Sequence, residues 1–148
     1  MDIWTKEKRS AVMSSIRSKD TRPEKKVRSL LHASGLRFRL HRKDLPGQPD
    51  IIFPKYNSAL FVNGCFWHYH QKCNHGKIPK SRQSYWKPKL LNTVRRDKRN
   101  IKNLKRLGWK VMVIWECEIN KNPRKATGKV IKFLDKHALE KFIPVKTK

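Results

Sequence analysis

The chain has 148 residues, and its 37 Lys and Arg against 11 Asp and Glu give a formal net charge of +26. So large a basic excess predicts a polyanionic partner, with nucleic acid as the first choice. Hydrophobic residues make up 37% and include 5 Trp and 6 Phe, which argues against a disordered chain. No run of 18 apolar residues is present, and the N-terminus lacks a signal-peptide core. We therefore expect one folded domain, in the cytoplasm, that binds nucleic acid and no membrane.

The first part of the chain predicts two helices. Scattered apolar residues in a basic stretch indicate a short helix near 6–17, within an N-terminal segment 1–20 that we expect to contact the nucleic acid. Thr21 and Glu24 have the spacing of a capping box, in which Glu24 reaches back to the N–H of the cap. The second helix therefore begins after Thr21, and Gly35 is a typical stop.

Short strands and a loop follow these helices. Apolar and polar residues alternate over 36–40, which predicts a half-buried strand. A turn rich in Pro and Gly at 45–49 precedes two short apolar strands at 50–53 and 59–62. Residues 64–80 hold Cys, His, Trp, Gly and Pro without a period, so we expect a shaped loop there.

The second half of the chain predicts helix, strand and helix. The helix at 85–107 carries an apolar stripe and ends at Gly108. The apolar run 110–115 predicts a strand covered on both faces. A last helix near 126–142 belongs to the C-terminal segment 121–148. The residues of the apolar stripe are Leu90, Leu91, Val94, Ile101, Leu104 and Leu107.

The order of these elements predicts the fold class. Residues 59–115 read strand, helix, strand, which is typical of a βαβ unit with parallel strands. With helices before and after, we expect an α/β fold: a small mixed sheet flanked by helices, in a single domain over 1–148. Functional groups in such sheets gather at strand ends, where the sequence places Asp50, Asn63 and Glu116.

Potential metal ligands are concentrated in the predicted loop. Cys65, His70 and Cys73 have the spacing C-x4-H-x2-C, and Cys117 follows at a predicted strand end. Four such ligands would form a closed, structural zinc site. His75 is an alternative to His70 as the histidine ligand. The alternative without metal is a buried pair of cysteines beside surface histidines.

Three more side chains can carry chemistry. If His70 binds zinc, His68 is left over as a general base, since imidazoles titrate near neutral pH; the alternative is a packed or exposed surface histidine. Asp50 can bind magnesium together with substrate phosphate oxygens, or it can cap the turn. Glu24 serves the capping box and can also contact a metal-bound water.

Aromatic and basic residues indicate contact with DNA. Phe66 and Trp67 adjoin the metal loop and can act as wedges between bases, although such a pair is commonly part of a core. Met13 and Trp86 are weaker candidates for the same role. Residues 87–110 hold ten Lys or Arg, with Asp97 as the only acid, and this imbalance favours phosphate contacts.

Taken together, five motifs between residues 45 and 117 resemble one known family. They are Leu45-Pro46-Gly47-Gln48-Pro49-Asp50, Phe61-Val62-Asn63-Gly64-Cys65-Phe66-Trp67-His68, Arg96-Asp97-Lys98-Arg99, Leu107-Gly108-Trp109-Lys110-Val111 and Trp115-Glu116-Cys117. The chain resembles the very short patch repair (Vsr) DNA mismatch endonucleases over roughly residues 7–120. The Gly-Cys-Phe-Trp-His block with the distal Trp-Glu-Cys is the most specific part of this likeness.

The resemblance implies a fold and an activity. The fold is a variant of the restriction-endonuclease-like α/β core with a zinc-bound loop. The activity is magnesium-dependent nicking of one DNA strand, 5′ to the thymine of a T:G mismatch that arises when 5-methylcytosine deaminates. The implied protein is a DNA repair enzyme, monomeric, cytoplasmic and nucleoid-associated, with mismatch-repair proteins as further partners.

The resemblance also implies residue roles. Asp50 looks like the metal-binding aspartate, His68 like the general base and Glu24 like an acid that assists through solvent. The implied structural zinc ligands are Cys65, His70, Cys73 and Cys117. The implied intercalating residues are Phe66, Trp67, Trp86 and Met13.

One pair of residues departs from the best-known members. Val62-Asn63 stands where they have Thr-His. The family Thr contacts the metal partly through its main-chain carbonyl, which Val62 still supplies. The family His binds the phosphate, and Asn63 can donate through its amide but cannot be a cation.

A rival interpretation is a non-catalytic basic zinc module that binds nucleic acid. It fits the composition equally well, but it assigns no role to Asp50 and Glu24.

Overall fold

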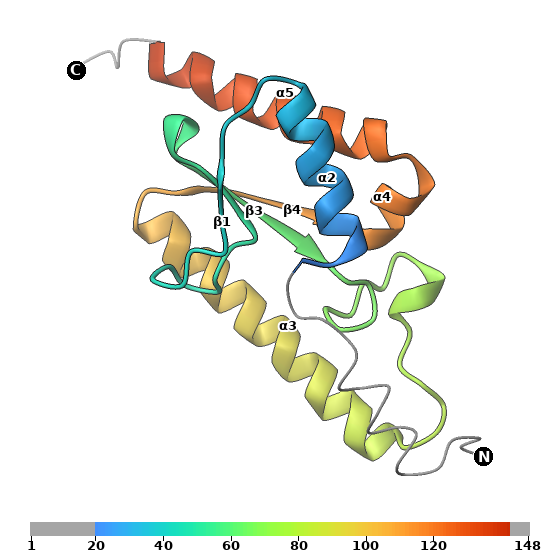
Figure 1. Ribbon diagram of the computed structural model, residues 1–148. Helices are drawn as coiled ribbons and strands as arrows, with labels where there is room; N and C mark the ends of the chain where they lie inside the picture. Colours follow the sequence, from blue (N-terminus) through green and yellow to red (C-terminus); the bar gives the residue numbers. More distant parts are fainter. Residues whose placement is uncertain (1–19, 143–148) are drawn as a thin grey trace.

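The computed structural model describes residues 20–142 of the chain, with side chains described as far as residue 136. Within this part a four-stranded sheet with the order β1-β2-β3-β4 lies between helices (Figure 1). β1–β2 and β2–β3 pair antiparallel, and β3–β4 pair parallel. The predicted mixed sheet is therefore confirmed. The strands are β1 (Arg39–Leu40), β2 (Ile51–Phe53), β3 (Ser58–Asn63) and β4 (Lys110–Trp115).

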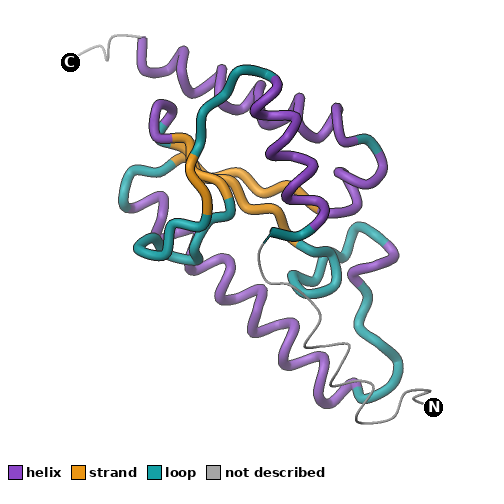
Figure 2. Tube along the Cα trace, in the orientation of Figure 1, coloured by secondary structure: helices purple, strands orange, loops and turns teal. Residues whose placement is uncertain are grey.

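Helices cover both faces of the sheet. One face carries α2, α4 and α5, which contact one another, and the opposite face carries the long α3 (Figure 2). Two short 3-10 turns, Pro54–Tyr56 and Asn74–Gly76, lie in connections. The helices are α2 (Arg22–Ala33), α3 (Gln83–Arg106), α4 (Glu116–Lys121) and α5 (Pro123–Phe142). The predicted helix at 6–17 and Met13 lie outside the described residues.

Alternation along the strands produces two cores. Leu60 of β3 packs with α2, α4 and α5, whereas its neighbour Ala59 packs with Leu104 of α3. Side chains one residue apart point to opposite faces of a sheet, so a short strand can contribute side chains to the core on each face. The larger core consists of Val27, Leu31, Ile51, Phe53, Leu60, Val62, Ile114, Ile119, Ala126, Val130 and Leu134.

The N-terminus of α2 is built as the sequence predicts, with one difference. Thr21 caps the helix, since its Oγ1 accepts a hydrogen bond from the N–H of Glu24 at 3.4 Å. The carboxylate of Glu24, however, accepts from the N–H of Asp20 at 3.1 Å and not from Thr21. The capping residue was predicted correctly, and the return bond reaches one residue further back, where it draws Asp20 into the site.

The unit β3–α3–β4 brings two distant segments together. The parallel register pairs Asn63 with Trp115, so the two strands end side by side. The chain therefore leaves β3 into the loop 64–80 directly beside the start of α4. This geometry, which the sequence predicts as a βαβ unit, places Cys65 close to Cys117, whose N–H lies 3.4 Å from the Cys65 Sγ.

Three predictions about elements were wrong in detail. The strand expected at 36–40 is reduced to Arg39–Leu40 and both residues are exposed, because β1 is an edge strand. Leu107 is 62% exposed, since α3 ends at Arg106 and the chain turns there into Gly108. Glu116 and Cys117 begin α4, a six-residue helix that no pattern indicated.

Strand β4 also differs from its prediction. Helices contact it on both faces, but Ile114 is its one fully buried residue, since β4 forms an edge of the described sheet. The last helix begins at Pro123, three residues before the predicted start. Among the residues that the structure describes, no helix is long and apolar enough to cross a membrane.

Candidate functional site

A cleft of about 1790 Å³ opens at the end of β3, between the start of α2 and the part of α3 from Tyr85 to Ile101. It receives polar side chains from elements that are far apart in the sequence. Its lining includes Glu24, Asp50, Asn63, His68 and Asp97. The structure therefore brings together all four side chains that the sequence predicts for catalysis, and it adds Asp97.

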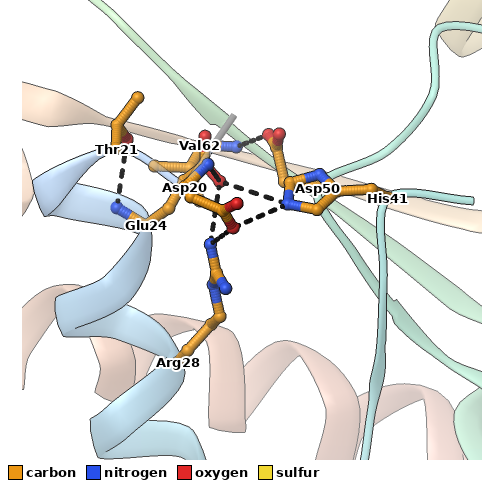
Figure 3. A network of polar contacts seen from close by, with 7 residues as sticks. All are labelled: Asp20, Thr21, Glu24, Arg28, His41, Asp50 and Val62. Carbon is orange, nitrogen blue, oxygen red and sulfur yellow. Dashed lines mark hydrogen bonds and ion pairs between the residues drawn. The ribbon is translucent and has the colours of Figure 1, made fainter. Parts of the chain in front are cut away.

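Asp50 lies on the floor of this cleft, one residue before β2. Its Oδ2 accepts a hydrogen bond from the N–H of Val62 at 2.7 Å, which ties it to β3 (Figure 3). Burial, followed by the negative charge of Glu24, raises the pKa of this carboxyl to about 7. Two carboxylates in so little solvent favour a cation between them and a phosphate.

Glu24 is the second acid of the site and is only 2% exposed. Its Oε2 lies 3.4 Å from Nη2 of Arg28 and 3.9 Å from Nε2 of His41. The same Arg28 nitrogen lies 2.6 Å from Oδ1 of Asp20, and His41 Nε2 lies 3.2 Å from that oxygen. Glu24 therefore lies in the first turn of α2 and also belongs to a charged network beside Asp50 (Figure 3).

His68 is paired with an acid that sequence reasoning missed. Its Nδ1 lies 2.6 Å from Oδ2 of Asp97, which α3 supplies from 29 residues further along the chain. A carboxylate at Nδ1 holds the proton on that nitrogen and leaves Nε2 as the acceptor. The available signal was that Asp97 is the one acid of the strongly basic helix α3.

Val62 and Asn63 occupy the end of β3. The N–H of Val62 is used by Asp50, and its carbonyl belongs to the segment that lines the cleft. Asn63 is 7% exposed and also lines the cleft. No hydrogen bond joins its side-chain amide to the described residues, so the amide is available to a ligand.

The four predicted zinc ligands meet in one cluster. One ligand atom from each of them lies within 4.8 Å of the others, and Cys117 Sγ lies 3.4 Å from His70 Nδ1. Tetrahedral zinc would separate such a sulfur and nitrogen by about 3.5 Å. The indole of Trp115 stacks on the His70 ring at 4.1 Å. The members are Cys65, His70, Cys73 and Cys117.

The cluster contains one of the two candidate histidines. His75 is exposed and is not part of the group, whereas His70 is. Burial raises the pKa of the Cys65 thiol to about 12, so a thiolate there requires a cation beside it. Three thiols and one imidazole, with no further ligand among the described residues, are a donor set that fits zinc.

The predicted wedge residues form one aromatic group at the rim of the cleft. The rings of Phe66, Trp67 and Trp86 meet edge to face, with centroids 5.1 to 5.9 Å apart. Tyr85, which is half exposed, extends this group, and Lys89 Nζ lies 5.6 Å from the Trp67 ring. The three predicted aromatics are partly buried, and Met13 lies outside the described residues.

Similar folds and sequences define the class of this protein. The fold is similar to the solved homing endonuclease I-Bth0305I catalytic domain, with a TM-score of 0.54, 21% identity and coverage of 80% of this chain and 98% of that one. The type II nicking enzyme V.XorIIP of Xanthomonas oryzae pv. oryzae is 55% identical over 119 residues, which span 80% of this chain and 87% of the relative. The chain is a DNA endonuclease.

The family follows from two further comparisons. DNA mismatch endonuclease Vsr of Escherichia coli (strain K12) is 42% identical over 118 residues, 80% of this chain and 75% of the relative. The model of the family described as DNA mismatch endonuclease Vsr matches residues 1–75. This chain belongs to the Vsr DNA mismatch endonuclease family, and the resemblance seen in its motifs is confirmed.

Proposed function

We propose that this endonuclease nicks one DNA strand 5′ to the thymine of a T:G mismatch, in a magnesium-dependent reaction that initiates very short patch repair of deaminated 5-methylcytosine. The observation that carries the proposal is the meeting of Asp50, Glu24 and the His68–Asp97 pair in one cleft. A protein that only binds DNA has no use for buried acids facing phosphate. Membership of the Vsr family supports the same reaction.

The donor atoms around Asp50 fit a hard divalent cation. The Asp50 carboxylate and the Val62 carbonyl would hold Mg²⁺ together with phosphate oxygens. Bound magnesium would neutralise charge on the reacting phosphate and on the leaving oxygen. The N–H of Val62 fixes Oδ2 of Asp50 at 2.7 Å, so this carboxylate is oriented before substrate binds.

The remaining residues of the cleft handle water and phosphate. His68 accepts a proton from the attacking water at Nε2, because Asp97 holds its Nδ1 and stabilises the imidazolium that forms. Glu24 orients solvent beside Asp50. Asn63 donates its amide hydrogens to a phosphate oxygen, the part taken by a histidine in the best-known relatives.

The Cys/His cluster has a structural part in this proposal. Cys65, His70, Cys73 and Cys117 would hold Zn²⁺ with no open position, which makes the site structural. The metal would fix the loop that carries both His68 and the wedge residues. Phe66, Trp67 and Trp86, with Met13 from outside the described residues, would enter between bases, where a mismatch costs least to unstack.

The proposed protein works as a monomer on double-stranded DNA. Mismatch-repair proteins are its further partners in this proposal, and its place is the cytoplasm, at the nucleoid. The strongly basic α3, which forms one wall of the cleft, supports DNA as the ligand.

A nicking assay tests the proposal. A labelled duplex with one T:G mismatch in varied flanking sequences is incubated with Mg²⁺ or EDTA, and a T:A duplex and the Asp50→Asn protein are controls. We expect one magnesium-dependent nick beside the thymine of the mismatch. Tight binding without cleavage in every context would contradict the enzyme and support a basic zinc module that only binds nucleic acid.

The role of His68 has its own prediction. His68→Ala should keep mismatch binding while the nicking rate falls by roughly 10²-fold or more, because the general base is lost. Asp97→Asn should slow nicking in the wild-type background and have little further effect in His68→Ala. Unchanged nicking by His68→Ala would remove this residue from the mechanism.

A further inference from the structure

Arg28, which no motif in the sequence singles out, lies behind the acidic pair of the cleft. It is one helical turn after Glu24 on α2, and its side chain is 17% exposed. Its Nη2 contacts two carboxylates at once, at 2.6 Å from Asp20 and 3.4 Å from Glu24 (Figure 3). Its Nε is buried and has no hydrogen-bond partner in the described part of the chain. The contacts of Nη2 with Asp20 and Glu24 offset the free-energy cost of leaving this donor unpaired.

The contacts to Glu24 all converge on one oxygen. Oε2 receives the N–H of Asp20 at 3.1 Å and Nη2 of Arg28 at 3.4 Å, and His41 Nε2 lies 3.9 Å away. No contact of this kind reaches Oε1 from the described residues. One carboxylate oxygen therefore anchors the side chain, and the other stays available in the cleft that Asp50 also lines.

Charge gives the second reason for this arrangement. Glu24, which is 2% exposed, lines the same cleft as Asp50, so two negative charges stand close together with little solvent around Glu24. A buried carboxylate needs a partner cation, and Arg28 supplies it at 3.4 Å from Glu24 Oε2. The hydrogen bond from Arg28, followed by that from His41, also lowers the pKa of Asp20, which keeps the Asp20 carboxylate ionised.

We propose that Arg28 is a positioning residue of the nuclease site, which holds Glu24 by one carboxylate oxygen so that the other can orient water beside Asp50. Asp20 supports this arrangement by binding Arg28, and His41 supports it by binding Asp20. The inference rests on the proposed function, because Glu24 has a role in orienting water only if the cleft cleaves DNA. It adds a residue that acts through Glu24 and touches no substrate.

A double-mutant cycle tests the inference. Arg28→Met, Glu24→Gln and the double variant are compared with wild type in single-turnover nicking at saturating DNA and Mg²⁺, and the free energy of unfolding is measured in urea with EDTA. We expect Arg28→Met to slow nicking roughly tenfold in the wild-type background and to have almost no further effect beside Glu24→Gln, because coupled residues are not additive. The affinity for mismatched DNA in EDTA should be unchanged.

Two further variants complete the experiment. Lys26→Met removes one positive charge from an exposed position on α2, so it controls for charge alone and should leave nicking unchanged. Arg28→Lys keeps the charge without the planar fork and should recover part of the rate. If Arg28→Met does not fold, Arg28→Lys and Asp20→Asn replace it in the same cycle with Glu24→Gln.

The outcomes separate the inference from the function on which it rests. Equal slowing by Arg28→Met in both backgrounds, while wild type nicks normally, would overturn the role of Arg28 and leave the nuclease intact. A wild-type protein that never nicks would overturn the proposed function, and the catalytic role of Arg28 with it. Coupling in both the rate and the unfolding free energy is the result that supports the inference.

Discussion

Asp50 is a partly buried carboxyl group in the same cleft as Glu24, and this position has a consequence for stability. Its pKa of about 7 in the folded chain lies above its ordinary value of 3.8. Between these two pH values the folded chain keeps a proton that the unfolded chain has released. The free energy of unfolding therefore falls as pH rises through this window, and the loss is complete above about pH 7.

This linkage gives a prediction for Asp50→Asn in the presence of EDTA. At pH 8 the variant should unfold with a free energy about 2 kcal/mol higher than wild type, because the amide carries no buried charge and still accepts the Val62 N–H. Near pH 4 the two proteins should be equally stable. Urea titrations at both pH values measure the difference.

Asp44 provides the matched control. It is an exposed acid whose pKa is lowered, chiefly by its hydrogen bond from Arg42. Asp44→Asn should therefore give no stabilisation at pH 8. If Asp50→Asn were as stable as wild type at both pH values, the raised pKa of Asp50 would be contradicted.

The turn that precedes Asp50 is held against α3 by a close contact. Gly47 has a φ of +74°, and a Cβ built there would lie 2.9 Å from Cβ of Asn100. The turn can approach α3 only because residue 47 has no side chain. The position of Asp50 therefore depends on a glycine that carries no chemistry.

Gly47→Ala should be more destabilising than Gly35→Ala. Both residues have positive φ, but nothing lies within 4 Å of a Cβ at Gly35. We expect a loss of about 1 kcal/mol at Gly35 from backbone strain alone, and a loss of about 2 to 3 kcal/mol at Gly47. Equal losses in urea unfolding would show that α3 accommodates the added methyl group.

Under the proposed function the Cys/His cluster fixes the loop 64–80, in which the structure describes one short 3-10 turn. Cys117→Ser should lower the zinc content measured by elemental analysis, expose the loop to proteolysis and abolish nicking. His75→Ala should leave all three properties unchanged, because His75 is exposed and outside the cluster. Loss of zinc from His75→Ala would instead place this histidine among the ligands.

The limits of sequence-based prediction are visible in particular residues of these elements. Spacing within the chain predicted the cap at Thr21, the buried strands β2 and β3, and the group of Cys65, His70 and Cys73, because each depends on neighbours in sequence. Asp97 was noticed only as an isolated acid, since its pairing with His68 exists only after β3, α3 and the loop have packed. The short helix α4 has no period, although Glu118 caps the Trp115 N–H at 3.1 Å.

The whole molecule carries a net charge of +26, and this predicts a steep dependence of DNA affinity on salt. Contacts with six to ten phosphates would reduce affinity by about 10³ to 10⁵ between 50 and 200 mM salt. Mismatched and matched duplexes should lose affinity in parallel, because wedge contacts are not electrostatic. Fluorescence anisotropy at several salt concentrations measures both slopes.

Variants of two basic residues test which surface causes the dependence of DNA affinity on salt. Arg96 of α3 lines the cleft, whereas Lys132 of α5 is exposed on the helix layer across the sheet. Arg96→Ala should reduce the slope by about one unit and Lys132→Ala should not. Equal reductions would show that DNA is bound by overall charge and not by the cleft.

The parallel pairing of β3 with β4 also sets the order in which the protein is completed during synthesis. Asn63 meets Trp115 only after the ribosome has made the whole of α3 between them. A nascent chain that ends before α4 already contains Glu24, Asp50 and His68, yet it lacks Cys117 from the cluster that holds the loop. Under the proposed function, an unfinished enzyme can associate with DNA through its charge but cannot cut it.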